Sequence, residues 1–253
     1  MPTPSFYPTG APIWIDLTSH DTAASTAFYE GLFGWTSSDG GSEFGGYVTF
    51  SLDDRRVAGM IGGASEGVPD SWTVYLQTDD AETTGQAVTG AGGLVFMGPQ
   101  QVGPMGTMLL AQDADRAVVG AWNPAQMTGF QALAEPGAPA WFELHTTSFD
   151  DEVQFYQQAF GWTTVSMPGG ADFRYSQLTH EGEMYAGVMD ASGYWTPGDP
   201  AAWLVYFNVA DADAAAARAV ELGGAIVDEP VDTPFGRMST LRDTTGALLK
   251  IIA

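Results

Sequence analysis

The sequence predicts an α+β protein of four βαβββ modules, arranged as two tandem domains with concave mixed sheets. Two repeated units are the main observations behind this prediction. The unit "WIDLTSHDTAASTAFYEGLFGW" (14–35) recurs without gaps as "WFELHTTSFDDEVQFYQQAFGW" (141–162). The unit "SWTVYLQTDDAETTGQAVTGAGG" (71–93) recurs in the same way as "AWLVYFNVADADAAAARAVELGG" (202–224). Because a repeat of this length is one supersecondary unit, the order A-B-A-B predicts four similar modules.

Each module shows the same order of elements. It opens with a strand in which apolar and polar residues alternate, as Ile15, Asp16 and Leu17 do. A helix follows, with Ser or Asp near its start and a glycine at its end, at Gly34, Gly93, Gly161 and Gly224. Short strands separated by glycine-rich turns complete the module, as in "GGYVTFSL" and "RRVAGMIGG". Hairpins after a single crossover helix predict helices on one face of the sheet and an open, concave other face, called the cup below.

The repeats also predict the domain boundaries. We expect an N-terminal domain at residues 11–123, with modules 11–62 and 71–123. We expect a C-terminal domain at residues 139–253, with modules 139–190 and 201–253. Residues 124–138 are rich in Pro, Gly and polar residues without a hydrophobic period, which is typical of a linker. A chain of 253 residues suits two domains of about 120 residues each.

Composition excludes several classes of partner. Thirty-one acidic residues against eight basic ones give a formal charge of -23, whereas nucleic acids and anionic membranes bind basic patches. The absence of cysteine excludes disulfides, thiolate metal sites and a Cys nucleophile. The N-terminus lacks the pattern of a secretory signal, and no apolar run approaches the roughly 18 residues of a membrane span. We therefore expect a cytoplasmic protein, monomeric or homodimeric, that binds neither nucleic acid nor membrane.

These repeats, the helix ends "FYEGLFGW" and "FYQQAFGW", and the final "DTTGALLKI" resemble the vicinal oxygen chelate superfamily. That superfamily includes glyoxalase I, extradiol dioxygenases, and fosfomycin- and bleomycin-resistance proteins. The doubled start W-x-[DE]-L-x-[ST] is more narrowly similar to two-domain glyoxalase-like proteins of actinobacteria, some labelled hydroxylases in aromatic polyketide clusters. The resemblance spans residues 11–253. It implies a fold, but the superfamily hosts many chemistries, so it does not imply one reaction.

In metal-dependent members of that superfamily, two modules cup together and four His or Glu ligands converge in the cup. Counting from the helix start and the D-x-x-G turn places these positions on residues that are neither His nor Glu. They are Trp14, the segment 58–60, Thr73 and Gly120 in one half, and Trp141, the segment 186–188, Leu204 and Lys250 in the other. Divalent metals prefer carboxylate or imidazole ligands, so we expect no metal and no other cofactor. An alternative metal site on Glu143 and His145 is short of ligands.

Strand parity predicts the side chains that line each cup, because residues two apart share a face. The predicted ligand-binding residues are Trp14, Asp16, Tyr75 and Gln77 in the N-terminal cup, and Trp141, Tyr206 and Asn208 in the C-terminal cup. The opposite faces are apolar and should pack against the helices. Aromatic rings with a few placed polar groups are typical of a small-molecule pocket. The alternative is that the Trp side chains simply fill the cups and the carboxylates bind neighbouring loops.

The two cups differ, because His145 and Lys250 occur only in the C-terminal one, at positions matching Thr18 and Gly120. Lys250 is the only lysine of the chain. Glu143, His145 and Lys250 are therefore the candidate catalytic residues. A buried Lys beside a carboxylate forms an ion pair or has a lowered pKa, and it can stabilise an enolate or phenolate.

His145 can shuttle protons near neutral pH, so it completes this candidate acid–base set. The alternatives are a Lys250 that extends to the rim and a His145 satisfied within the strand. Trp195, with Tyr194, either covers the C-terminal cavity or fills the domain edge.

Three functions follow from these features. The first is a metal-independent enzyme of secondary metabolism that acts on an aromatic or polycyclic, polyketide-like molecule by proton-transfer or oxygenation-type chemistry. Its activity would resemble that of an isomerase, lyase or hydroxylase. The second is a non-catalytic protein that binds and sequesters an antibiotic or related small molecule. A metal-dependent glyoxalase or dioxygenase is the third.

Overall fold

The computed structural model describes residues 7–41, 44–63, 70–168, 173–196, 198 and 200–253. The N-terminal half consists of β1 (Pro12–Ser19), α1 (Thr22–Phe33), β2 (Thr36–Asp39), β3 (Val48–Leu52), β4 (Arg55–Gly62), β5 (Ser71–Gln77), α2 (Ala81–Gly90), β6 (Leu94–Val102), β7 (Gly106–Gln112) and β8 (Val118–Pro124). The C-terminal half consists of β9 (Pro139–Thr146), α3 (Phe149–Phe160), β10 (Thr164–Ser166), β11 (Tyr175–His180), β12 (Glu183–Asp190), β13 (Ala202–Asn208), α4 (Ala212–Glu221), β14 (Ala225–Thr233), β15 (Gly236–Arg242) and β16 (Leu248–Ile252). Four βαβββ modules are therefore present, as predicted.

Each half forms one open, eight-stranded mixed sheet. The strand order is β2-β3-β4-β1-β5-β8-β7-β6 in the N-terminal sheet and β10-β11-β12-β9-β13-β16-β15-β14 in the C-terminal sheet. The first strand of each module pairs in parallel with its last strand, and the two modules meet at the antiparallel pairs β1–β5 and β9–β13. The cups predicted from the repeats are thus formed by two consecutive modules of the same half.

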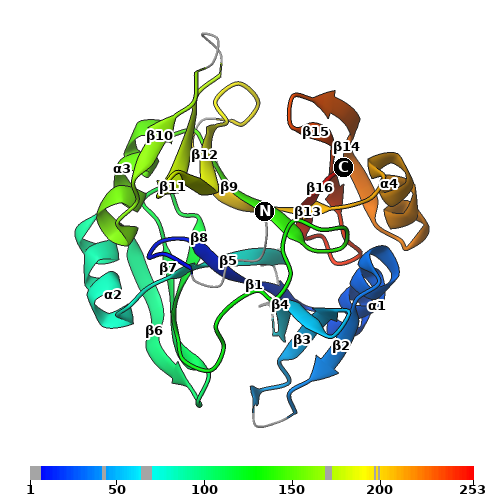
Figure 1. The fold of residues 1–253 in the computed structure, drawn as a ribbon, viewed down its shortest axis with the longest axis horizontal. Coiled ribbons are helices and arrows are strands. Elements are labelled where there is room, and N and C mark those ends of the chain that lie inside the picture. Colours follow the sequence, from blue (N-terminus) through cyan, green and yellow to red (C-terminus); the bar gives the residue numbers. More distant parts are fainter. Residues whose placement is uncertain (1–6, 42–43, 64–69, 169–172, 197, 199) are drawn as a thin grey trace.

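The helices lie in two pairs, each with one helix from either half. Figure 1 shows α2 beside α3 on one side of the molecule and α1 beside α4 on the other. The pairs are tight, because a Cβ at Gly93 would meet the ring of Phe155, and a Cβ at Gly224 would meet that of Phe28. Glycine at these two positions lets a helix of one half press against the loop after a helix of the other.

The predicted terminal glycines cap α1 and α3, but those predicted for α2 and α4 lie two residues beyond the C-caps, which are Ala91 and Leu222. Gly34 and Gly161 end α1 and α3 in the left-handed conformation that glycine adopts without strain. After α2 and α4 the glycines with positive φ are Gly92 and Gly223, one residue before the predicted positions. Gly93 and Gly224 are glycines for another reason: a side chain at either position would collide with a phenylalanine ring of the other half.

An aromatic layer joins the two sheets on their helix-facing sides. The ring of Phe207 on β13 lies 4.9 Å from that of Phe33 and 5.5 Å from that of Trp72, both in the other half. Strand residues predicted to face away from the cups are buried here: Ile15, Leu17, Trp72, Val74, Leu76, Phe142, Leu144, Trp203, Val205 and Phe207. The two halves therefore share a single hydrophobic core.

Two hydrogen bonds related by the repeat cross between the halves at the edges of this core. The Tyr29 hydroxyl on α1 donates to Asp243 Oδ2 at 2.9 Å, and the Tyr156 hydroxyl on α3 donates to Asp113 Oδ2 at 2.9 Å. Asp243 opens the D-x-x-G turn at 243–246 of the C-terminal half. Asp113 opens the matching turn at 113–116 of the N-terminal half, where Arg116, with a φ of 74°, stands in place of the glycine. The turn that precedes the last strand is thus held by the helix of the opposite half.

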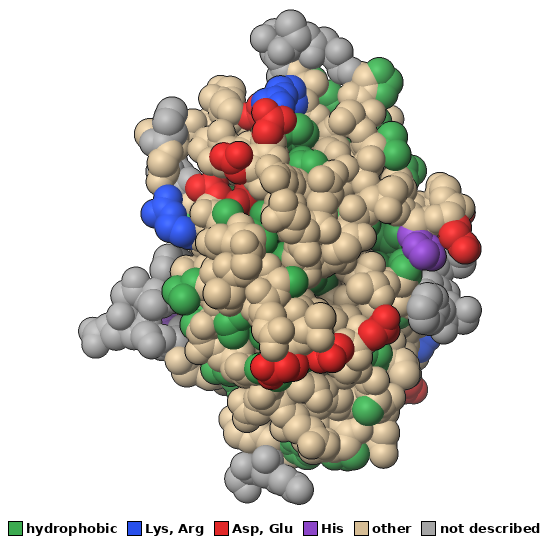
Figure 2. All heavy atoms as spheres, turned by 90° about the vertical axis from the view of Figure 1, so that its left-hand side faces the viewer, with side chains coloured by type: hydrophobic (Ala, Val, Ile, Leu, Met, Phe, Trp, Pro, Cys, Tyr) green, Lys and Arg blue, Asp and Glu red, His purple; other side chains and the backbone are tan. Residues whose placement is uncertain are grey.

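The surface over α2 and α3 is acidic. Figure 2 views the face that carries α2 and α3, where Asp and Glu side chains are spread over the surface among few Lys and Arg side chains. This agrees with the excess of 31 acidic over 8 basic residues. Within the described part of the chain, no helix is long and apolar enough to cross a membrane.

Candidate functional site

Strand register places the predicted cup residues in continuous rows across each sheet. In the N-terminal cup, Asp16 on β1 lies between Gly59 on β4 and Thr73 on β5. In the C-terminal cup, the matching row is Gly187, Glu143 and Leu204. A second row joins Trp14, Tyr75 and Gly120 in one half, and Trp141, Tyr206 and Lys250 in the other. Neighbours in register share a face, so these side chains are brought together in each half.

Each cup contains a second tyrosine that the sequence reasoning missed. In the C-terminal cup the Tyr175 hydroxyl accepts from Trp141 Nε1 and donates to Glu143 Oε2, both at 2.8 Å. In the N-terminal cup the Tyr47 hydroxyl accepts from Trp14 Nε1 at 2.8 Å and donates to Asp16 Oδ1. The missed signal was a further repeat, since "GGYVTF" and "FRYSQL" place these two tyrosines at matching positions of the two halves.

Glycines create the space for these tyrosine hydroxyls. A Cβ at Gly59 would overlap the Tyr47 hydroxyl, and one at Gly187 would overlap the Tyr175 hydroxyl. Both glycines lie in the segments 58–60 and 186–188, which match positions where metal-dependent members of the superfamily carry a metal-binding side chain. The ring of Tyr75 covers Gly120 in the same way. Tyrosine rings therefore occupy the places from which metal ligands would project.

Glu143 is the centre of the hydrogen-bond network in the C-terminal cup. Its Oε1 accepts from the Tyr206 hydroxyl at 2.7 Å and lies 2.6 Å from His145 Nε2, while Oε2 accepts from Tyr175. Burial opposes ionisation of this carboxyl, but the hydrogen bond and charge of His145, with the two tyrosine hydroxyls, outweigh it and lower the Glu143 pKa. Glu143 is therefore a carboxylate at neutral pH.

The loop after β12 covers His145. The Tyr194 hydroxyl lies 2.8 Å from His145 Nδ1, and the ring of Trp195 lies 5.7 Å from the imidazole ring. His145 is 3% exposed, whereas Tyr194 is 57% exposed. Trp195 thus lies against a candidate catalytic residue.

Among the described residues, Lys250 contacts an aromatic ring and no carboxylate. Its Nζ lies 5.2 Å from the ring centroid of Tyr206, and no ion pair with Glu143 forms in the described part of the structure. The Tyr206 hydroxyl binds Glu143, so this ring separates the lysine from the carboxylate. The sequence predicted either an ion pair between Lys250 and a carboxylate or a lowered Lys250 pKa, and the ion pair is absent among the described residues. Its charge instead polarises a tyrosine that touches the carboxylate.

The N-terminal cup has the same aromatic frame without an acid–base partner. Burial raises the pKa of Asp16 to about 6, against the hydrogen bonds from Tyr47, Tyr75 and Trp14, which lower it. The linker residue Phe130 packs its ring 5.5 Å from that of Trp14, which is 3% exposed, while Trp141 is only partly buried. Trp141 is therefore the more accessible of the two tryptophans, whereas Glu143 and His145 are buried and the matching Asp16 and Thr18 are partly exposed.

The amide residues predicted for ligand binding differ between the cups. Gln77 is buried and its Nε2 donates to Asp79 Oδ1 at 3.0 Å, leaving a buried Oε1 without a partner among the described residues. Asn208 is partly exposed on β13. Gln77 therefore has its amide group turned to a local partner, whereas Asn208 remains accessible.

Apolar side chains are exposed on the same faces of the sheets. In the C-terminal cup Leu248 is 36% exposed and lies in the row of Glu143, while Val231 is 58% exposed further along the sheet. In the N-terminal cup Val118 and Leu94 are 36% and 59% exposed in the row of Asp16. Exposed apolar surface on a concave face is typical of a binding site for an apolar ligand.

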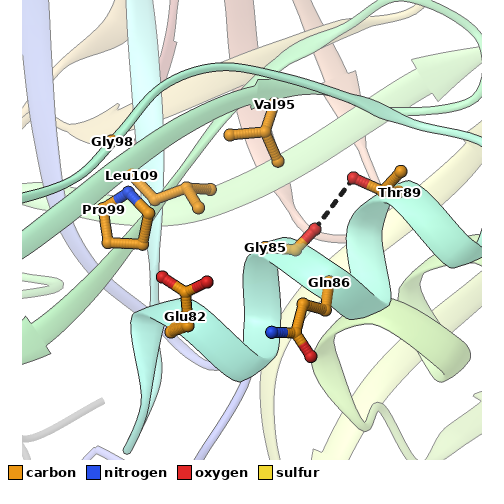
Figure 3. Close-up of a pocket in the computed structure, with 8 residues that line it drawn as sticks. All are labelled: Glu82, Gly85, Gln86, Thr89, Val95, Gly98, Pro99 and Leu109. Carbon is orange, nitrogen blue, oxygen red and sulfur yellow. Dashed lines mark hydrogen bonds between the residues drawn. The ribbon is translucent and has the colours of Figure 1, made fainter.

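Two surface pockets lie outside the predicted site. One of about 410 Å³ lies between α2 and β6, where Figure 3 shows Glu82 and Gln86 on the helix and Val95, Pro99 and Leu109 above them in the view. None of the predicted site residues lines it. The other, of about 330 Å³, is lined by Trp72, Trp203, Leu204, Leu248 and Arg242 among others, and so reaches the edge of the C-terminal cup.

The residues of the cups do not fit a divalent metal. Each cup offers one carboxylate, already bound by tyrosine hydroxyls, and glycine or lysine at other ligand positions. Among the described residues no group of three or more His, Cys, Asp or Glu is arranged to hold a metal ion. Metal independence stays a prediction.

The open eight-stranded sheets built from paired βαβββ modules define the class of protein. The chain belongs to the Glyoxalase/Bleomycin resistance protein/Dioxygenase superfamily, whose family model matches residues 138–251. It is 37% identical over 262 residues to the anthracycline biosynthesis protein DnrV of Streptomyces peucetius, covering 96% of this chain and 93% of DnrV. It is 36% identical over 258 residues to CFP32 of Mycobacterium tuberculosis, named as a candidate glyoxylase, covering 100% of this chain and 98% of CFP32.

Solved structures agree on the fold. The Mn(II)-bound glyoxalase from Novosphingobium aromaticivorans has a TM-score of 0.66 at 16% identity, covering 96% of this chain and 81% of that chain. The 2,3-dioxygenase LapB from Pseudomonas sp. KL28 also has a TM-score of 0.66, at 11% identity, covering 96% and 92%. At these identities the likeness extends to the fold alone, so the chemistry of this chain depends on its own residues.

Proposed function

We propose that this protein is a metal-independent enzyme of secondary metabolism that transfers protons on an aromatic or polycyclic, polyketide-like molecule in its C-terminal cup. The observation that carries the proposal is the buried Glu143 carboxylate, which contacts His145, Tyr175 and Tyr206 within 2.8 Å. The relative DnrV, named for anthracycline biosynthesis, supports the context. An oxygenation-type reaction is the less favoured form, since the residues assembled here are acid–base groups.

The roles of the residues follow from their contacts. Ionised Glu143 accepts the Nε2 proton of His145, which leaves Nδ1 as the position that accepts or releases a proton. The imidazolium that forms when Nδ1 accepts a proton is stabilised by the adjacent carboxylate. Lys250, over the ring of Tyr206, supplies the positive charge that favours an enolate or phenolate on the substrate.

The exposed apolar residues of the cup indicate the kind of substrate. Leu248 and Val231 offer apolar surface to a flat ring system, and partly exposed Trp141 adds an aromatic edge. Burying such surface gives about 25 cal/mol per Å². A polycyclic ligand is therefore held mainly by apolar contact, while the polar groups orient it.

Proton transfer can be tested without the natural substrate. We would measure exchange of the C1 protons of 2-tetralone, a bicyclic aromatic ketone, with D2O by 1H NMR. The wild type should accelerate exchange above buffer, and Glu143→Gln and Lys250→Met should abolish this while ligand affinity changes within about tenfold. Asp16→Asn, the matched change in the N-terminal cup, serves as control and should keep the rate. A wild type that accelerates no exchange would contradict the proposal.

A second function is non-catalytic binding of a small molecule. The N-terminal cup favours it, because Asp16 lies among Trp14, Tyr47 and Tyr75 without a histidine, an arrangement that suits a planar or cationic ligand. Tight binding of candidate ligands by the wild type, with conversion of none, would support this function over the enzyme.

A third function, a metal-dependent glyoxalase or dioxygenase, is tested by elemental analysis. Stoichiometric divalent metal in the purified protein would overturn the assignment of the ligand positions.

A further inference from the structure

We propose that Tyr194 is the catalytic residue that touches the substrate and relays protons between it and His145. This rests on the proposed function, but adds a residue that the repeat and strand parity do not indicate. Tyr194 lies in the loop after β12, outside both sheets.

The first observation is that His145 has no nitrogen available to a ligand. Its Nε2 lies 2.6 Å from Glu143 Oε1, and its Nδ1 lies 2.8 Å from the Tyr194 hydroxyl. The residue is 3% exposed, and the Trp195 ring packs beside it at 5.7 Å. A substrate in the cup therefore cannot reach either ring nitrogen without displacing a bonded partner.

The second observation is that Tyr194 connects this buried imidazole to solvent. Tyr194 is 57% exposed, although its hydroxyl binds His145. Backbone hydrogen bonds from Tyr194 N and Trp195 N to the Ala191 carbonyl, at 3.0 and 2.8 Å, hold the loop as a turn. Of the linked groups Glu143, His145 and Tyr194, the tyrosine is the accessible one.

The charges around Tyr194 make it a relay rather than a final acid. Partial burial raises the pKa of its phenol, and the negative charges of Glu143, Asp190 and Asp228 raise it further. A phenolate at this position is disfavoured, so Tyr194 can release its proton only if it receives another at once. His145 Nδ1 is the group within hydrogen-bond distance that supplies it.

The proton balance of the step is simple. When His145 is the imidazolium, the Tyr194 O–H proton passes to the substrate oxyanion or carbanion while the Nδ1 proton passes to the Tyr194 oxygen. The imidazolium becomes neutral imidazole, and Tyr194 ends as the neutral phenol. In the opposite direction, the substrate loses a proton to Tyr194 while the phenol proton moves to Nδ1. No oxidant or other reactant is required.

Tyr194→Phe tests the relay, because it keeps the ring and removes the hydroxyl. In the 2-tetralone assay we expect an exchange rate about 100-fold lower than wild type, within the range for a general acid–base group. Ketone affinity should be unchanged, since the ring remains. Tyr185→Phe, a partly exposed tyrosine on β12, is the matched control and should exchange at the wild-type rate.

Chemical rescue separates a relay from a merely structural role. Added phenol should restore part of the exchange activity of Tyr194→Phe, and the restored rate should vary with the pKa of substituted phenols. In parallel, 15N NMR of the three histidines should show that Tyr194→Phe shifts the Nδ1 resonance of His145 and leaves His20 and His180 unchanged.

The outcomes distinguish the two proposals. Full exchange activity in Tyr194→Phe, absence of phenol rescue, or an unshifted His145 Nδ1 resonance would each overturn the relay. The proposed function of Glu143 and His145 in proton transfer would still stand. Failure of the wild type to exchange the ketone would instead contradict the proposed function, and the relay with it.

Discussion

Glu143 Oε1 and His145 Nε2 lie 2.6 Å apart on one face of β9, and this pair is the main difference between the two cups. The matching residues of β1 are Asp16 and Thr18. The pKa of Glu143 is lowered, whereas that of Asp16 is raised to about 6. The same position in the repeat therefore holds an ionised carboxylate in one half and a carboxyl that titrates near neutrality in the other.

Glu143→Gln should destabilise the protein most at neutral pH. A carboxyl with a lowered folded pKa contributes stability above its ordinary value of 4.5, and loses it as pH falls through the folded value. We expect a loss of about 1–3 kcal/mol at pH 7 from the weakened charged hydrogen bonds. Urea denaturation should show this difference shrinking below pH 4.5. Exposed Glu229→Gln is the control, and a pH-independent difference would refute the explanation.

Glu152→Gln should abolish a loss of folding stability that the wild type shows as pH rises. Glu152 is fully buried beside Asp113, without a hydrogen-bond partner among the described residues, and burial with the charge of Asp113 raises its pKa. Folding therefore retains a proton that the unfolded chain releases, so stability falls as pH rises above 4.5.

Chemical denaturation between pH 6 and 9 measures this effect. Wild type should lose up to about 1.4 kcal/mol per pH unit from this group, and the glutamine variant should not. Ser25→Ala, the matching position in the other half, should leave the slope unchanged. Equal slopes for wild type and Glu152→Gln would show that the buried carboxyl is ionised.

Gly187→Ala should disorganise the C-terminal cup. The new Cβ would overlap the Tyr175 hydroxyl, which would lose its bonds to Trp141 and Glu143. We expect a loss of about 1–3 kcal/mol, together with a change in tryptophan fluorescence. Gly193→Ala, where a Cβ meets nothing within 4 Å, should be neutral. An unchanged spectrum would mean that the tyrosine does not occupy this space in solution.

Phe207→Ala should weaken both halves together. The ring is fully buried and packs against Phe33, Trp35 and Trp72 of the other half. The expected loss is about 3–5 kcal/mol, and thermal unfolding should remain a single transition because the core is shared. Val231→Ala, 58% exposed, is the control. Separate transitions for the two halves would contradict the shared core.

The module order and the strand faces could be predicted because they depend on local pattern. Alternation such as Ile15, Asp16, Leu17 assigns faces at any position in a sheet, and the structure buries Ile15 and Leu17 as predicted. The glycines predicted to end α2 and α4, Gly93 and Gly224, lie two residues beyond the helix caps, since glycine is needed there for contact with rings of the other half. Contacts between segments that lie far apart in the sequence leave no local pattern.

The sequence by itself determined the four modules, their pairing into two sheets, and the absence of His and Glu from the expected ligand positions. Repetition and period-two alternation are local properties, so they are readable before folding. Tertiary structure alone decided that Tyr175 binds Glu143, that Lys250 meets Tyr206, and that Tyr194 covers His145. These contacts depend on strand register and on a loop position, both set by packing across the whole sheet.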